Sequence, residues 1–192
     1  ITDGVHFKQI GTAQDHKRIG EGDTGLNTGG MGAYSPSLLI TKEIEKKIID
    51  QIIIPTIKGM NEIGCKYKGI LYAGLMIKNN EPKLIEYNIR FGDPECQALM
   101  MRLDDDLFDI ILSSVEEKLD NKPIKWSPSP SITIVAASRG YPESYETKKE
   151  LKNLPDNSIK NEQMFHAGTI KINEKILSNG GRVLNSTVSL PT

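Results

Sequence analysis

The sequence has 192 residues, of which 38% are hydrophobic and 26% are charged, and its formal net charge at pH 7 is -1. This length allows one large domain or two small ones with a buried core. The near-neutral charge gives no electrostatic reason to expect a nucleic acid or an anionic membrane as partner, and no apolar run approaches the roughly 20 residues that span a bilayer. Two cysteines are too few for a disulfide framework, which favours a reducing, cytoplasmic setting.

The two ends of the sequence indicate a piece of a longer polypeptide. The chain opens with Ile1 rather than Met, and no signal segment follows. It stops at Leu190-Pro191-Thr192, directly after a strand-like run. We therefore expect an N-terminal part of the same polypeptide to be missing and the C-terminal segment to be truncated. The alternative is a complete small protein whose initiator region has been removed.

The first third of the chain is expected to contain a strand, a long loop and a helix. Residues 5–14 have a strand-like pattern, whereas residues 15–37 hold six glycines and few large apolar side chains. Loops of that length in a compact domain are usually functional or disordered. Thr41 suits the N-cap of a helix whose isoleucines recur at helical spacing, which Pro55 interrupts and Gly64 ends.

A β-hairpin and two helices are predicted next. Residues 68–78 and 83–91 are rich in β-formers and flank a turn signal at 79–82. Asp93 is expected to cap the following helix, with Pro94 at its first position.

The second of these helices is expected over residues 107–119. The amino-acid composition changes after it. Residues 121–130 contain three prolines, and short strand-like runs separated by turn signals follow. We predict an α+β fold with two parts. Residues 1–122 would form an antiparallel sheet with packed helices, and residues 123–192 would form a small strand-rich subdomain.

The return strand of the hairpin carries two distinct sets of side chains. Because strand side chains alternate faces, one face is expected to be core and the opposite face polar. The core set is Ile85, Tyr87, Ile89 and Phe91, and the polar set is Glu86, Asn88 and Arg90. A solvated outer face is the simpler interpretation of the polar set. Asn, however, is a poor strand former, and a helix start directly after the strand would attract anions.

The polar set has the chemistry of a magnesium–triphosphate clamp. Oxygens of Glu86 and Asn88 are hard ligands suited to Mg²⁺, which proteins usually hold with one or two groups plus substrate phosphates. Arg90 is a planar, permanent cation that can contact a transferring phosphoryl group.

The glycine-rich loop Asp23–Gly32 would let the backbone approach a ligand closely. It is not a Walker A loop, since no Gly-Lys-Ser/Thr follows, and it lacks the strand–turn–helix setting of a dinucleotide site. A flexible surface loop is the alternative. Lys17 and Arg18 lie just upstream and could meet phosphate, although charged runs are usually solvated. Arg182 could reach a ligand, but a surface strand after a glycine turn is the favoured expectation. His166 could act in catalysis, since histidine titrates near neutrality, but a structural role in the C-terminal sheet is favoured.

The strings DTGLNTGGMGAYSP and RFGDPE, together with FHAGT and NGGRVL, resemble the phosphoribosylamine–glycine ligase (glycinamide ribonucleotide synthetase) family over about residues 12–184. The resemblance implies the C-terminal part of an ATP-grasp ligase of de novo purine synthesis. Such an enzyme joins glycine to 5-phosphoribosylamine through a glycyl phosphate, with ATP as co-substrate and Mg²⁺ or Mn²⁺ as metal. It also implies that the isolated chain, lacking the N-terminal part, has no ligase activity and binds ATP weakly.

The resemblance assigns roles to particular residues of this sequence. Glu86 and Asn88 match metal ligands, and Arg90 matches the arginine that stabilises the phosphoryl group in transfer. The phosphate-binding role predicted for Lys17 and Arg18 rests on their charge and position and not on the resemblance. The positions matching the substrate pocket are Asp23, Thr24, Asn27, Gly29, Gly30, Gly32, Asp93 and Glu95. Two other functions remain open: another ATP-grasp ligase of the purine pathway, and a non-catalytic nucleotide-binding module, for which the metal clamp would serve no purpose.

Overall fold

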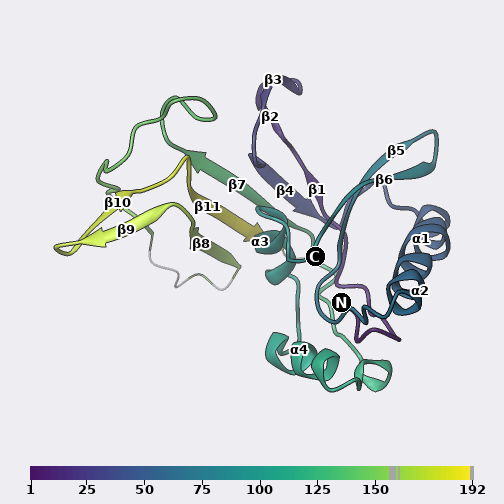
Figure 1. The fold of residues 1–192 in the computed structure, drawn as a ribbon. Coiled ribbons are helices and arrows are strands. Elements are labelled where there is room, and N and C mark those ends of the chain that lie inside the picture. The colour runs from purple at the N-terminus through teal and green to yellow at the C-terminus, as the bar shows by residue number, and fades with distance from the viewer. Residues whose placement is uncertain (156–158, 160, 191–192) are drawn as a thin grey trace. The chain divides into compact units, whose positions relative to one another are not determined.

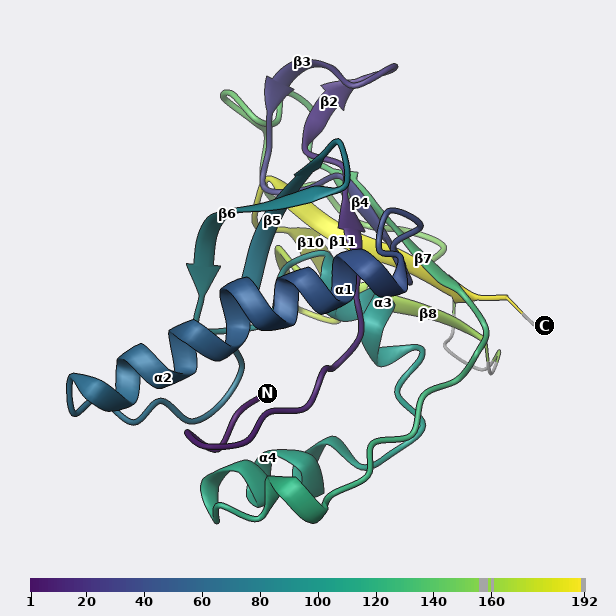
Figure 2. The ribbon, with the colours of Figure 1, turned by 90° about the vertical axis from the view of Figure 1, so that its right-hand side faces the viewer.

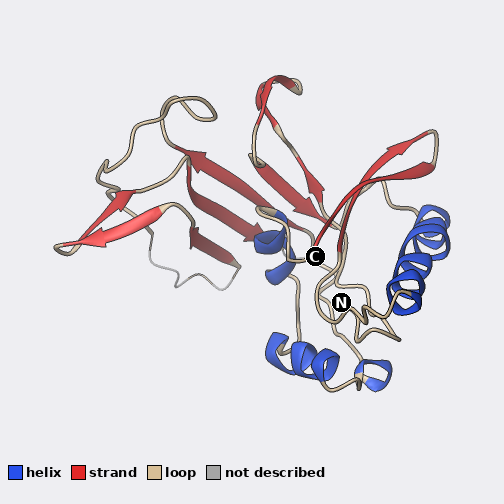
Figure 3. Ribbon diagram, viewed as in Figure 1, coloured by secondary structure: helices blue, strands red, loops and turns tan. Residues whose placement is uncertain are grey.

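The fold is a computed structural model that describes residues 1–155, 159 and 161–190. The chain forms two compact units, each assembled from three separate segments. Unit 1 comprises Ile1–Thr12, Ser37–Gly92 and Leu103–Ser127, and unit 2 comprises Ala13–Pro36, Asp93–Arg102 and Pro128–Thr192. Helices and antiparallel strands are mixed, which confirms the predicted α+β class (Figure 3). Pro191 and Thr192, where the predicted truncation falls, lie outside the described residues. No helix in the described ranges is long and apolar enough to cross a membrane.

One long helical rod of unit 1 begins at Thr41, whose side chain accepts a hydrogen bond from the Ile44 amide at 3.3 Å, as predicted. It consists of α1 (Lys42–Ile48), a π-helical stretch (Ile49–Ile53) and α2 (Ile54–Glu62), which run on without a break (Figure 2). The predicted interruption at Pro55 therefore takes the form of a π-helical stretch just before the proline, which lies in the first turn of α2. Gly64, with a φ of 76°, follows the end of the rod.

The predicted hairpin is confirmed as β5 (Tyr72–Lys78) and β6 (Glu81–Asn88), which pair antiparallel in unit 1. Asn79 and Asn80 connect them with φ values of 53° and 60°. Two successive residues with positive φ define a turn that matches the twist of the flanking strands, and asparagine tolerates this conformation.

The predicted core face of β6 is largely wrong. Ile85 is 66% exposed and Ile89 77% exposed, whereas Tyr87 is half-buried. Two structural causes are visible. The β5–β6 register shifts between Gly74 and Leu75, which leaves Ile85 as a bulge without a cross-strand partner. The helical rod also covers only part of the face, since it is the Tyr87 hydroxyl that contacts Thr56.

The core of unit 1 brings together residues from its first and last segments. Ile1, Ile10, Ile110 and Leu119 form the buried cluster, with Phe91 and Trp126 among the side chains packed against it. Helix α4 (Leu107–Val115) supplies Ile110 and is followed by a 3₁₀ turn, Leu119–Asn121, so the predicted helix over 107–119 ends early. The predicted strand over 5–14 is also wrong: it is represented by an isolated bridge between Thr2 and Phe7 and by Gln14 of β1.

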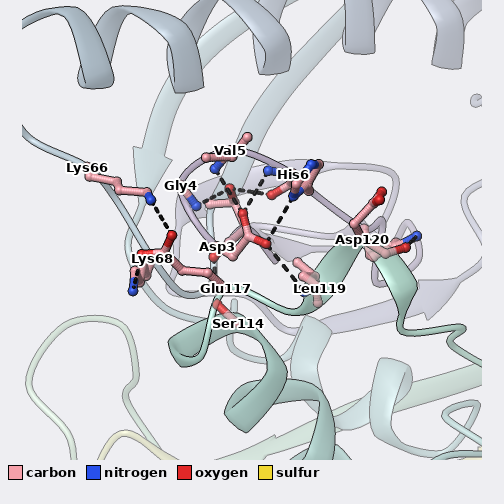
Figure 4. A network of polar contacts seen from close by, with 12 residues as sticks. Asp3, Gly4, Val5, His6, Lys66, Lys68, Ser114, Glu117, Leu119 and Asp120 are labelled. Carbon is pink, nitrogen blue, oxygen red and sulfur yellow. Dashed lines mark hydrogen bonds and ion pairs between the residues drawn. The ribbon is translucent and has the colours of Figure 1, made fainter.

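A buried carboxylate organises the N-terminal segment of unit 1 (Figure 4). Asp3 has no exposed surface and accepts hydrogen bonds from the amides of Val5 (2.9 Å), His6 (2.7 Å) and Leu119 (3.3 Å). Burial raises the pKa of Asp3, but the His6 and Val5 amides and the His6 side chain outweigh it and hold the pKa below its ordinary value. The Ser114 hydroxyl donates to the Thr2 carbonyl at 2.6 Å and ties α4 to the same segment.

Unit 2 is built on a five-stranded antiparallel sheet of order β1-β4-β7-β11-β8 (Figure 1). These strands are β1 (Gln14–Asp15), β4 (Gly32–Ser35), β7 (Ser131–Ala137), β8 (Glu162–His166) and β11 (Arg182–Ser189). The short helix α3 (Glu95–Met100) packs on β4, β7 and β11. Thr133 and Thr187 share a buried hydroxyl hydrogen bond of 2.7 Å between the central strands, which satisfies both polar groups.

Two hairpins extend the strand content of unit 2. β2 (Arg18–Gly20) pairs with β3 (Thr24–Asn27), and β9 (Thr169–Ile172) pairs with β10 (Lys175–Ser178). The loop predicted over 15–37 is thus not structureless, because it contains one hairpin and strand β4. Sequence patterning missed β2 and β3 because these strands are short and mostly exposed, so they lack the apolar alternation of a half-buried strand.

Candidate functional site

The proposed metal ligands lie next to each other on β6 in unit 1. Glu86 is paired with Gly74 and Asn88 with Tyr72 across the hairpin. The Asn88 side-chain amide donates to the Glu86 carboxylate, with Nδ2 and Oε1 3.1 Å apart. Both side chains therefore lie on the same face of the strand, as the alternation predicted. Gly74 helps this arrangement, since a Cβ at that position would come within 3.1 Å of the Glu86 Cγ.

These two residues fit a magnesium or manganese ion. A carboxylate and an amide this close can turn one oxygen each toward a shared cation, and such ions commonly take one or two protein ligands together with substrate phosphates. Glu86 is exposed, so the carboxylate is open to a ligand. Whether the pair binds metal stays a prediction.

Arg90 lies beyond the last residue of β6, where the chain bends. Its guanidinium Nη1 donates to the Phe91 carbonyl at 2.8 Å, and the side chain is otherwise exposed. A guanidinium has five donors, so this contact leaves others for an anionic group. The position is compatible with the predicted contact to a phosphoryl group.

In unit 2, the end of the glycine loop is held by one long-range and one local hydrogen bond. The Gly29 amide donates to the Tyr141 hydroxyl at 2.9 Å, and the Gly30 amide donates to the Thr28 hydroxyl at 3.0 Å. Gly30 has a φ of 115°, and a Cβ there would lie 2.4 Å from Pro94 Cδ. Glycine is required at this position by both the backbone conformation and the space.

The other predicted pocket residues of the loop belong to the β2–β3 hairpin and to β4. Asp23 and Thr24 are at the β2–β3 turn, with Asp23 at a φ of 59°, and the Thr24 hydroxyl donates to the Glu21 carbonyl within the hairpin. Asn27 pairs with Arg18, whose guanidinium donates to the Gly25 carbonyl. Gly32 belongs to β4, where a Cβ would lie 2.8 Å from the Thr133 carbonyl oxygen.

The predicted capping role of Asp93 is wrong. Helix α3 begins at Glu95 after Pro94, and its N-terminus has no side-chain cap. The Asp93 carboxylate instead accepts from Gln97 Nε2 at 2.9 Å and from Arg182 Nη2 at 3.1 Å. The carboxylate is therefore occupied by two side-chain donors and does not cap the helix. With only six residues, α3 also offers little of the helix dipole invoked for anion binding.

The predicted surface position of Arg182 is also wrong, although the predicted strand is present. Arg182 begins β11, but its side chain is only 21% exposed and contacts the loop and Asp93. The sequence signal was the glycine pair directly before it, which leaves room for close contacts. Residue spacing alone could not identify partners 89 and 153 positions away.

A buried negative cluster lies beside the loop, and its member Asp15 was not among the predicted site residues, whereas Glu95 was. The Asp15 side chain is 8% exposed and its Oδ2 lies 3.0 Å from Lys17 Nζ; Glu95 is 3% exposed. Burial raises the pKa of Asp15, the charge of Glu95 raises it further, and Lys17 offsets this only in part. Burial likewise raises the pKa of the Cys96 thiol, with further contributions from Asp93 and Glu95. Lys17, proposed to meet phosphate, is thus engaged by a carboxylate.

The fold of this chain belongs to the ATP-grasp class. A crystal structure of phosphoribosylamine–glycine ligase from Thermotoga maritima superposes with a TM-score of 0.82 at 33% identity, over 94% of this chain and 44% of that one. Residues 1–96 match the ATP-grasp (A) domain of phosphoribosylglycinamide synthetase, and residues 131–192 match its C domain. The chain belongs to the phosphoribosylglycinamide synthetase family, which confirms the resemblance. The predicted domain boundary at 122/123 falls between the two matched regions and stays a prediction.

Curated relatives agree with this assignment. The chain is 50% identical over 188 residues to a phosphoribosylamine–glycine ligase of Vibrio parahaemolyticus, covering 97% of this chain and 44% of that protein. It is also 50% identical to the enzyme of that name from Vigna unguiculata, again over 97% of this chain and 62% of the relative. The chain thus spans roughly half the length of the relatives it matches.

Proposed function

We propose that this chain is part of a phosphoribosylamine–glycine ligase of de novo purine biosynthesis. The enzyme would join glycine to 5-phosphoribosylamine, giving glycinamide ribonucleotide, while ATP is converted to ADP and phosphate in the cytoplasm. The observation that carries the proposal is the 50% identity to relatives of that name over 97% of the chain. Because the chain spans 44% of the bacterial relative, its partners would include the remainder of the same polypeptide.

The reaction proceeds in two substitutions. A carboxylate oxygen of glycine attacks the γ-phosphorus of ATP, ADP leaves, and glycyl phosphate forms. The amino nitrogen of phosphoribosylamine then attacks the acyl carbon, inorganic phosphate leaves, and the surplus proton on nitrogen passes to solvent. No protein nucleophile is needed, so catalysis rests on positioning and on neutralisation of the phosphate charge.

Unit 1 would supply the triphosphate clamp. Glu86 and Asn88 would hold Mg²⁺ or Mn²⁺, which when bound neutralises charge on the ATP phosphates. Arg90 would place its free guanidinium donors on the phosphoryl group in transfer. The 3.1 Å approach of Glu86 to Asn88 supports a shared ligand for the two side chains.

Unit 2 would supply substrate contacts. Gly29, Gly30 and Asp93 are assigned to glycine or to the ribose phosphate, and their convergence on one arginine supports grouping them in one pocket. Glu95 would contribute charge beside them, since it is buried in the same cluster as Asp15. The assignment of Asp23, Thr24, Asn27 and Gly32 to this pocket rests on the family resemblance.

The test is phosphate release by the full-length enzyme that contains this chain, in the presence of ATP, glycine and phosphoribosylamine. Glu86→Gln removes the charged ligand while keeping the side-chain volume, and turnover is expected to fall by about a hundredfold or more. Glu81→Gln is the matched control on the same strand. Glu81 forms an exposed ion pair with Lys47 at 2.6 Å beside the hairpin turn, and its loss should leave turnover unchanged.

Binding of Mn²⁺, followed by electron paramagnetic resonance in the presence of ATP, gives a second readout of the same variants. Glu86→Gln should weaken the bound Mn²⁺ signal, and Glu81→Gln should not. Full turnover by Glu86→Gln would refute the metal assignment. Phosphate release that needs neither glycine nor phosphoribosylamine would refute the proposed reaction.

A further inference from the structure

We propose that Arg182 is a positioning residue that shapes the substrate pocket of unit 2 by joining the glycine loop to Asp93. The identity of the substrate rests on the function proposed above, but the geometric role of Arg182 does not. The residue stands at the start of β11, far along the chain from both of the segments it joins.

The guanidinium of Arg182 makes four hydrogen bonds in unit 2. Nη1 donates to the carbonyls of Gly29 (2.9 Å), Gly30 (3.3 Å) and Asp93 (2.6 Å), and Nη2 donates to the Asp93 carboxylate (3.1 Å). A planar fork holds its donors to two backbone segments in one fixed geometry, whereas the three donors of lysine rotate about a single nitrogen. Because Nη1 and Nη2 both donate to oxygens of the protein, the side chain is suited to fix the geometry of these two segments.

Gly29 provides independent support, because it leaves the space that the guanidinium fills. A Cβ on Gly29 would lie 2.9 Å from Arg182 Cζ, 3.0 Å from Nη2 and 3.1 Å from Nε. Unlike Gly30, Gly29 has no positive φ, so its backbone conformation suits any residue. A side chain at position 29 would therefore displace the Arg182 guanidinium from its present place.

The opposite side of the loop is held by a tyrosine. The Tyr141 hydroxyl accepts the Gly29 amide proton, and Gly181 leaves room for the Tyr141 ring, since a Cβ there would lie 2.3 Å from its Cδ2. The segment Gly181-Arg182 thus supports the loop twice, once directly and once through Tyr141. Loop carbonyls, loop amides and the Asp93 carboxylate are all fixed before a substrate arrives, which is what preorganisation of a binding site requires.

Amide hydrogen exchange in the 192-residue chain tests the geometric role without reference to ligase activity. In Arg182→Ala, exchange at Gly30 and Met31 is expected to accelerate about tenfold or more, because the loop opens locally. Exchange at Thr187, in the middle of β11, should stay unchanged. Arg182→Lys should fail to restore protection, because it keeps the charge but loses the fork.

A double-mutant cycle separates Arg182 from general loss of packing. Gly29→Ala should accelerate loop exchange in the native background and add little in the Arg182→Ala background, since the clash partner is then gone. Additive effects, or unchanged loop exchange in Arg182→Ala, would overturn the inference.

Steady-state kinetics of the full-length enzyme test the link to substrate. Arg182→Ala should raise the KM of glycine or of phosphoribosylamine about tenfold, with the KM of ATP unchanged. Faster loop exchange with both substrate KM values unchanged would overturn the statement that this loop meets substrate. Should the native full-length enzyme lack ligase activity, the proposed function fails, and the exchange data still decide the role of Arg182.

Discussion

Two buried aspartates, one in each unit, have opposite environments. Asp3 in unit 1 receives three backbone amides and a His6 contact, and its pKa is held below the ordinary value. Asp15 in unit 2 has Lys17 as its ion-pair partner and the charge of Glu95 nearby, and burial raises its pKa. Asp3 stabilises the segment around it, whereas an ionised Asp15 opposes folding of its own unit.

The contrast separates a structural network from a candidate site. A buried carboxylate that is fully hydrogen-bonded rigidifies a fold. A carboxylate held beside another one, at a loop that is itself fixed by Arg182, has the kind of perturbed environment that clusters at functional sites. The following changes would break or sharpen this comparison.

The largest effect is expected from glycine substitutions in the two regions. Gly30→Ala places a Cβ 2.4 Å from Pro94 Cδ and 2.7 Å from Asp15 Oδ1 at a φ of 115°, in surroundings that cannot give way. We expect a loss of about 4 kcal/mol in the unfolding free energy, from backbone strain plus overpacking. Urea unfolding followed by far-ultraviolet circular dichroism measures it.

Gly4→Ala is the matched control in the Asp3 region. Gly4 has a φ of 92°, but its Cβ would meet the side chain of Lys66, which can swing into solvent. The loss should be limited to about 1–2 kcal/mol of backbone strain. Equal losses in the two variants would show that the Asp15 region is not tightly packed.

Asparagine substitutions should then change the unfolding free energy differently at Asp3 and at Asp15. Asp3→Asn weakens charge-assisted bonds from three amides and should lower the unfolding free energy by about 2 kcal/mol. Asp15→Asn removes a buried charge, and Lys17 can turn to solvent, so the change should stay within about 1 kcal/mol or raise stability. Trp126, the single tryptophan, packs against the core of unit 1 and reports that unit by fluorescence. Exchange of β7 amides reports unit 2.

The smallest expected effect is a pH dependence of the unfolding free energy, which has opposite signs for Asp3 and Asp15. The lowered pKa of Asp3 means that its contribution is present above the unfolded value of about 3.9 and is lost as the pH falls through the folded value. The raised pKa of Asp15 means that its penalty is absent below the unfolded value and sets in as the pH rises through the folded value. The stability lead of the native chain over Asp3→Asn should therefore grow as the pH rises toward about 3.9, whereas its lead over Asp15→Asn should shrink as the pH rises beyond about 3.9. Parallel trends would contradict the two environments.

Local signals in the sequence were reliable because their chemistry is complete within a few residues. Thr41 needed only the amide of Ile44 to cap its helix, and Asn79-Asn80 needed only their own tolerance of positive φ to turn the hairpin. The pairing of Glu86 with Asn88 on one face followed from the period of a strand.

Long-range contacts determine the features that local sequence patterns did not predict. Ile85 and Ile89 have the alternation of a core face, but only part of that face is covered in unit 1. Asp93 has every local feature of a cap, yet Arg182, 89 residues away, holds its carboxylate. The burial of Asp15 likewise depends on elements distant in sequence, so neither spacing nor composition could reveal it.

The interleaving of the two units limits how the molecule can be divided. The chain passes between units after residues 12, 36, 92, 102 and 127, so neither unit is a continuous stretch of sequence. No single proteolytic cut or shortened gene can release one unit whole. The motif RFGDPE spans one of these passages between units, since Arg90 belongs to unit 1 and Asp93 to unit 2. An insertion of a few residues after Gly92 would lengthen the covalent link between unit 1 and unit 2 at this passage.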